Sequence, residues 1–85
     1  MQMLYNSDSY AVVQFELPGE AGEATRGGYE IVDKFARMEI YIEGAIAQSF
    51  REGVQALISD ESSVEDLDEY IAGYAQLAPQ PLRFH

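Results

Sequence analysis

The sequence contains no cysteine, a single histidine and only five basic residues, and each shortage excludes a class of function. Without cysteine the chain forms no disulfide, no thiolate metal site and no cysteine nucleophile. The one histidine is the last residue, His85, so a histidine-based catalytic site would have to form at a terminus, where chains are usually frayed. Stability must therefore come from packing or from self-association.

The shortage of basic residues leaves a net charge of −10, from 15 acidic residues against five basic ones. Such a chain is repelled by the phosphate backbone of nucleic acids and by anionic lipid surfaces. The basic side chains are also too scattered to line a groove, so we expect no nucleic-acid binding. The acidity is typical of a small cytoplasmic domain that its charge keeps soluble, with a basic partner or nucleic-acid mimicry as the alternative.

Long apolar runs are missing as well. The first ten residues, MQMLYNSDSY, contain neither a basic segment nor an apolar one, which argues against a secretory leader. No stretch approaches the roughly 20 apolar residues that a membrane span requires. We therefore expect a cytoplasmic location and no membrane partner. The length of 85 residues predicts one domain, residues 1–85, with a small core.

Hydrophobic periodicity is clearest in residues 27–58, where it changes from a strand repeat to a helical repeat. Residues 39–43, Glu-Ile-Tyr-Ile-Glu, alternate as in a strand, whereas the apolar residues that follow recur three or four positions apart. We predict a hairpin with strands at residues 29–33 and 38–42, followed by a helix over about residues 44–59.

A helix that begins at Tyr29 is the alternative for the hairpin, because four apolar residues there also share a helical face. They are Ile31, Phe35, Met38 and Ile42. The glycines before Tyr29 and the β-branched residues of the segment favour strands, so we adopt the hairpin, with residues 34–37 at its tip.

The segments before this stretch predict another hairpin and a loop. Residues 3–5 and 10–17 are short apolar runs separated by turn-forming residues, which is typical of a hairpin. Residues 18–28 hold four glycines and a proline and form a loop. The loop lacks the Gly-Lys-Ser/Thr ending of a P-loop, so no phosphate site is predicted.

A second helix and a short tail complete the predicted fold. Ser62 and Glu65 match a capping box, and apolar periodicity then continues as far as Pro79. Gly53, inside the first helix, costs roughly 1 kcal/mol relative to alanine, which close packing against a neighbour would explain. Residues 81–85 alternate as an edge strand does. The predicted class is α+β: an antiparallel sheet of four or five strands, from two N-terminal hairpins and a C-terminal edge strand, covered on one face by a two-helix hairpin.

Several segments together resemble a family of short betaproteobacterial proteins that is classed as a domain of unknown function. They are the opening Met-Gln-Met-Leu-Tyr-Asn-Ser, residues 27–34, residues 39–45, Phe50-Arg51-Glu52, and residues 80–85. The resemblance covers nearly the whole chain and supports the second hairpin. The family pattern has a Thr-Gly or Ser-Gly pair after Lys34, where this chain has Phe35-Ala36, so the geometry of that tip stays open. The family brings no activity, cofactor or catalytic residue.

We predict no cofactor and no metal site. The densest acidic run lacks the alternating spacing and the glycine of a calcium loop, and we interpret it as stabilising the positive end of the second helix. It consists of Asp60, Glu61, Glu65, Asp66, Asp68 and Glu69. Glu16, Glu30, Glu39 and Glu43 have no cleft that would hold a sugar between paired carboxylates. Lys34 and Arg37 are expected to pair with Asp33 or with a neighbouring subunit.

The sequence leaves two hypotheses for function. The first is a small acidic protein-interaction module that self-associates or binds an unknown protein partner. The alternative is a small ligand carrier or enzyme with a pocket between sheet and helices, lined by Tyr29, Phe50 and Tyr74. We favour the interaction module because the polar groups that catalysis needs are few.

The expected partner surface is the sheet face turned away from the helices. We assign Phe15, Ile31, Ile40 and Ile42 to the helix side by the period of two. The opposite side is then apolar at its centre, with charged residues around it. The predicted contact residues are Tyr10, Val12, Val32 and Tyr41.

Overall fold

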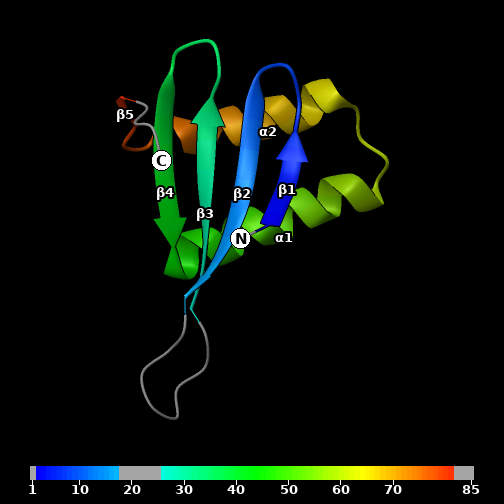
Figure 1. Cartoon of the computed structure of the whole chain (residues 1–85). Helices are drawn as coiled ribbons and strands as arrows, with labels where there is room; N and C mark the ends of the chain where they lie inside the picture. The colour runs from blue at the N-terminus through cyan, green and yellow to red at the C-terminus, as the bar shows by residue number, and fades with distance from the viewer. Residues whose placement is uncertain (1, 18–25, 82–85) are drawn as a thin grey trace.

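Five antiparallel strands form one layer and two helices form the other (Figure 1). The computed structural model describes residues 2–17 and 26–81. In these ranges the strand order is β1-β2-β3-β4-β5, and both helices lie on one face of the sheet (Figure 1). This confirms the predicted α+β fold. The elements are β1 (Gln2–Asn6), β2 (Tyr10–Leu17), β3 (Arg26–Asp33), β4 (Met38–Glu43), α1 (Gly44–Ser59), α2 (Val64–Ala75) and β5 (Gln80–Pro81).

The second hairpin is confirmed, and the alternative of a helix from Tyr29 is wrong. Strands β3 and β4 pair in antiparallel register across the turn of residues 34–37. The Asp33 carboxylate accepts a hydrogen bond of 3.0 Å from the Ala36 amide, and Arg37 takes the left-handed conformation with φ 56. These two flanking residues make the turn, which is why the poor turn residues between them are tolerated.

Strand β3 begins earlier than predicted, because residues 26–28 belong to the sheet and not to the loop. Leu17 pairs with Arg26 and Phe15 with Gly28, so the antiparallel pairing of β2 with β3 includes Gly27 and Gly28. The rest of the predicted loop, residues 18–25, lies outside the described residues. Most of the predicted tail strand, residues 82–85, also lies outside the described residues. The short strand β5 pairs with Met38 and Glu39 of β4.

The first helix has the predicted bounds, whereas the second differs at both ends. Its N-cap is Ser63, whose hydroxyl accepts a hydrogen bond of 3.2 Å from the Asp66 amide. Ser62, the predicted cap, is still engaged with the end of α1, since its amide donates to the Leu57 carbonyl at 3.0 Å. Helix α2 ends at Ala75, before the apolar periodicity does.

The core lies between the sheet and the helices. Val12, Ile31 and Phe50 are fully buried there, and Ile71 of α2 is buried with them. The ring centroids of Phe50 and Tyr29 are 5.5 Å apart, which joins α1 to β3. Burying side chains of this size contributes about 1.5–3 kcal/mol each.

The facing predicted for β2 is wrong, while that of Ile31, Ile40 and Ile42 is confirmed. Val12 pairs with Ile31, which pairs with Ile40, so these three side chains share the helix side. Phe15 is an odd-numbered residue of the same strand and therefore points away from the helices. Both faces of β2 carry apolar residues, so its own pattern does not settle the parity, and a shift by one residue exchanges the faces.

Gly53 has the packing role that its place in a helix suggested. Tyr70 of α2 lies against it, and a Cβ at position 53 would overlap the Tyr70 ring and hydroxyl. The Tyr70 hydroxyl donates to the Ser49 carbonyl at 3.3 Å, one turn earlier in α1. The missing side chain therefore allows the two helices to approach.

Replacing this glycine with alanine should destabilise the protein, although alanine is the better helix former. We expect Gly53→Ala to lower the free energy of unfolding by about 1–3 kcal/mol through overpacking. The matched control is Gly73→Ala in α2, where nothing lies within 4 Å of the added Cβ, and it should stabilise by up to about 1 kcal/mol. Urea denaturation measures both changes. Equal stabilisation by the two substitutions would show that Tyr70 does not constrain position 53.

Candidate functional site

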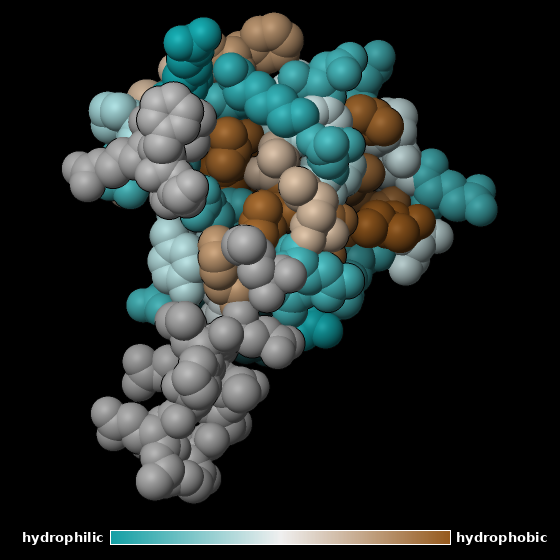
Figure 2. Space-filling model, in the orientation of Figure 1, coloured by the Kyte–Doolittle hydropathy of each residue, from teal (hydrophilic) through white to brown (hydrophobic). Residues whose placement is uncertain are grey.

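The face of the sheet that points away from the helices is the candidate site. In residues 2–17 and 26–81 neither helix covers this face, which is turned toward the viewer in Figure 1. Figure 2, in the same orientation, shows hydrophobic residues gathered over the middle of the sheet. By strand register the apolar side chains of this outer face are Ala11, Val13, Phe15, Val32 and Tyr41.

Two of the four predicted contact residues lie on the outer face and two do not. Val32 and Tyr41 are there, and Tyr41 is 40% exposed. Val12 is fully buried against the helices, and Tyr10 packs against the same core. Because β2 faces the other way from the prediction, Val13 lies on the outer face in place of Val12.

An aromatic pair organises one end of the outer face. The rings of Phe15 and Tyr41 meet edge to face, with centroids 6.1 Å apart and an interplanar angle of 64°. Gly28 pairs with Phe15 in the strand between them, and a Cβ at position 28 would overlap the Tyr41 ring. The glycine thus leaves the space in which the Tyr41 ring lies. A glycine inside a strand was the sequence signal for this close approach, and sequence reasoning missed it by placing Gly28 in a loop.

The outer face is acidic around its apolar centre. Glu30 pairs with Tyr41, and Glu39 with Val32, so both carboxylates share this face. Glu39 is only 5% exposed. Both glutamates were expected on this face, whereas half of the predicted apolar residues differ.

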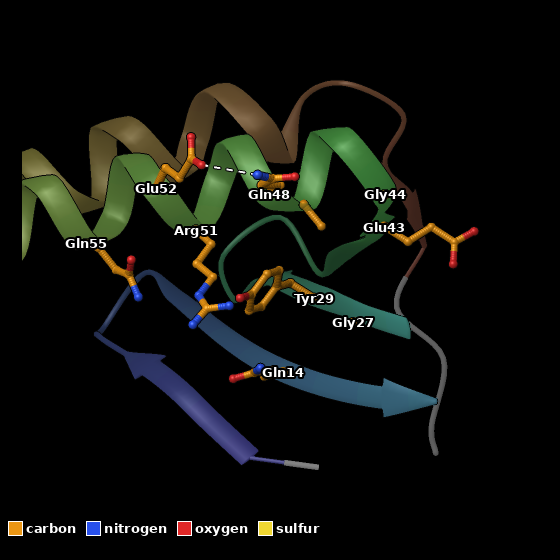
Figure 3. A pocket seen from close by; sticks show the side chains of 10 residues that line it. Gln14, Gly27, Tyr29, Glu43, Gly44, Gln48, Arg51, Glu52 and Gln55 are labelled. Atoms are coloured by element: carbon orange, nitrogen blue, oxygen red, sulfur yellow. Dashed lines mark hydrogen bonds between the residues drawn. The ribbon is translucent and has the colours of Figure 1, made fainter. Parts of the chain in front are cut away.

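A second concave feature lies on the helix side, where α1 meets the end of the sheet (Figure 3). It is an open cleft of about 720 Å³, and its lining is mainly polar. Arg51 extends from α1 into it towards Tyr29 and Gln14, while Gln48 donates a hydrogen bond of 3.3 Å to Glu52 at its rim (Figure 3). The cleft contains no paired nucleophile and base among the described residues.

Two of the three residues predicted to line a pocket between sheet and helices, Phe50 and Tyr74, pack against each other there. Phe50 is fully buried, and its ring centroid lies 5.0 Å from that of Tyr74. The Tyr74 hydroxyl is 3.0 Å from the Ser49 hydroxyl and 3.2 Å from the Tyr70 hydroxyl. Of the three predicted lining residues, only Tyr29 borders the cleft of Figure 3.

Two of the charged residues considered for binding, Asp68 and Lys34, make structural contacts. Asp68 accepts hydrogen bonds from the Tyr5 hydroxyl at 2.9 Å and the Ser7 hydroxyl at 2.8 Å, which fastens the first hairpin to α2. Lys34 donates to the Asn6 side chain at 2.6 Å and to the Ser7 carbonyl. It therefore joins the two hairpin tips, and the predicted pairing with Asp33 is replaced by this contact.

Residues 2–17 and 26–81 contain no group of three or more His, Asp or Glu side chains placed to hold a metal ion. Within the same ranges, neither helix has the length and apolar character needed to cross a bilayer.

Comparison with known proteins places the chain in a family. The model of a family described as protein of unknown function, DUF3567, matches residues 1–85. The chain belongs to the DUF3567 family. It is also similar to Protein BTH_I0359 of Burkholderia thailandensis, with 45% identity over 85 residues that cover all of both chains. No solved structure matches the chain. The resemblance read from the sequence is confirmed, and DUF3567 membership leaves the function to be argued from the geometry.

The tyrosine cluster between the helices should make the free energy of unfolding depend on pH in the alkaline range. Burial, followed by the hydrogen bond to Tyr74, raises the pKa of Tyr70 from 10.0 to about 12. Because the folded state favours the neutral phenol, its contribution to stability is complete below pH 10 and is lost as the pH rises towards 12. We expect the free energy of unfolding to fall over this interval, and Tyr70→Phe to remove part of the fall.

Urea denaturation at steps between pH 9 and 12 measures this effect. Burial also raises the pKa of Tyr5 and of Tyr10, so the variant should keep a smaller decline. An identical decline in the wild type and in Tyr70→Phe would contradict the assignment.

Proposed function

We propose that this protein is a small acidic cytoplasmic protein-interaction module that binds its partner through the outer face of the sheet. The observation that supports the proposal is the apolar centre of that face, with Val13, Val32 and Tyr41 on three adjacent strands. An uncovered apolar face with a polar surround is typical of a protein contact surface. The proposal needs no cofactor and no nucleic acid.

Burial of this apolar area would stabilise a complex. At about 25 cal/mol per Å², burying several hundred square ångströms offsets part of the loss of translational and rotational freedom. Tyr41 is the best anchor, because tyrosine combines a large ring with few rotatable bonds, and the contact with Phe15 orients that ring.

Charge favours one kind of partner over another. In a two-fold homodimer through this face, two copies that each carry a net charge of −10 would repel one another. A different protein, with an apolar centre and basic residues around it, complements the face better. Self-association through the same face is the second form of the proposal and should strengthen with salt.

The test is Tyr41→Glu, which adds a charge to the centre of the outer face. Tyr41 is 40% exposed, so the fold should survive with a small change in melting temperature. We expect the variant to lose the stoichiometric partner that wild-type protein retains from the native lysate, or to lose a dimer seen by light scattering after size exclusion.

The matched control is Phe35→Glu, which adds the same charge at an aromatic residue that is 80% exposed on the turn between β3 and β4. It should bind as the wild type does. Equal retention of partners by both variants, or a monomeric wild type without any partner, would refute the outer face as the interaction surface.

A further inference from the structure

Strand β1 forms an open and uncharged edge of the sheet. Within residues 2–17 and 26–81 it pairs only with β2, so the main-chain groups on its other side face no strand. Its sequence, Gln-Met-Leu-Tyr-Asn, has no charged residue in a chain whose net charge is −10. Natural sheets protect such an edge with charges, particularly lysine, with proline, or with short and bulged strands. Here an irregular register between Met3 and Tyr5 shortens the regular edge without charging it.

Both helices continue past this edge. Figure 1 shows the connected ends of α1 and α2 projecting beyond β1. The helix face that buries Phe50 and Val54 under the sheet continues at the next turn to Ile58, which is 55% exposed. In α2 the face that buries Leu67 begins one turn earlier with Val64, which is 56% exposed. Figure 2 shows hydrophobic residues on this side of the molecule.

One turn of helix is about as long as the spacing between neighbouring strands. The helices cross the strands in Figure 1, so successive helical turns pass beneath successive strands. One turn of helix advances about 5.4 Å, and neighbouring strands lie about 4.7–4.9 Å apart. Ile58 and Val64 lie at the connected ends of the two helices and form an exposed apolar floor on which a sixth strand beside β1 could pack.

We propose that this edge binds an extended segment of another polypeptide, which adds as a sixth strand beside β1 and packs on Ile58 and Val64. Main-chain hydrogen bonds to β1 would hold the segment, and its alternate side chains would contact the floor. The helix connection beside that floor carries the exposed carboxylates of Asp60, Glu61 and Glu65. The complementary segment carries apolar residues at alternate positions and basic residues between them.

A second copy of this chain fits the edge less well than such a segment. Two β1 strands paired about a two-fold axis would each bring their own projecting helices into the layer that the other copy's helices occupy. The same arrangement would place the acidic helix connections close together. A segment without a helical layer of its own avoids both conflicts. Tyr41 lies on the outer face of β4, whereas Ile58 and Val64 belong to the helices on the opposite side of the sheet, so Tyr41→Glu and the variants below report on different surfaces.

The experiment uses synthetic peptides as probes of the intact protein. The first probe is a labelled, end-capped seven-residue peptide of alternating lysine and valine, followed by fluorescence anisotropy at low salt. The second replaces lysine with glutamate, and the third carries N-methyl groups that block one hydrogen-bonding edge. We expect saturable binding of the first probe alone, with amide NMR shifts concentrated in residues 2–6.

Protein variants locate the binding. The double substitution Ile58→Ser and Val64→Ser should weaken the first probe about tenfold, the loss expected for about 1.4 kcal/mol of apolar contact. The matched control is Ile46→Ser, at a residue that is 49% exposed near the other end of α1, and it should bind within about twofold of the wild type.

Four results would overturn the proposal. Equal binding by the double variant would show non-specific attraction of cations to an acidic protein, and equal binding of the N-methylated probe would show that no strand pairing occurs. A wild-type dimer that the double variant dissociates would make a second copy the occupant of the edge. Absence of binding by the first probe would likewise contradict a strand-accepting edge.

Discussion

The register of the three central strands determines what the two faces of this sheet do. Because Val12, Ile31 and Ile40 are cross-strand neighbours, their side chains lie together on one face, and both helices pack against it. Phe50 extends this core from α1 to the rings of Tyr29 and Tyr74. Because the helices cover one face of the sheet, the remaining apolar residues of the strands lie on the outer face.

Sequence reasoning succeeded where a segment has only one apolar face. Residues 38–59 alternate with a period of two and then of 3.6, and strand β4 and helix α1 follow that change. In β2 it failed, because odd and even positions are both apolar and only the pairing with β3 selects between them. This one ambiguity accounts for the misplacement of Tyr10 and Val12 in the predicted site. The close approach of Tyr41 to Gly28 depends on two strands and cannot be read from either alone.

The outer face and the β1 edge share a boundary. Met3 of β1 pairs with Val13 of β2 and is 55% exposed, so the apolar centre of the sheet reaches the open edge without an intervening charge. The two surfaces differ in chemistry, since side chains supply the first and main-chain groups the second. A single partner that covers the face and adds a strand would use both, and the small core of an 85-residue chain would then be extended by its partner.

The facing of β2 is the central claim, and a pair of nearly isosteric substitutions tests it most directly. Val12→Thr places a hydroxyl in the fully buried core and should lower the free energy of unfolding by about 1–3 kcal/mol. Val13→Thr places the same group on the outer face and should change stability by no more than about 0.5 kcal/mol. Denaturation of the two variants side by side gives the answer. A larger loss at Val13 than at Val12 would mean that the helices cover the opposite face, which would contradict both proposed surfaces.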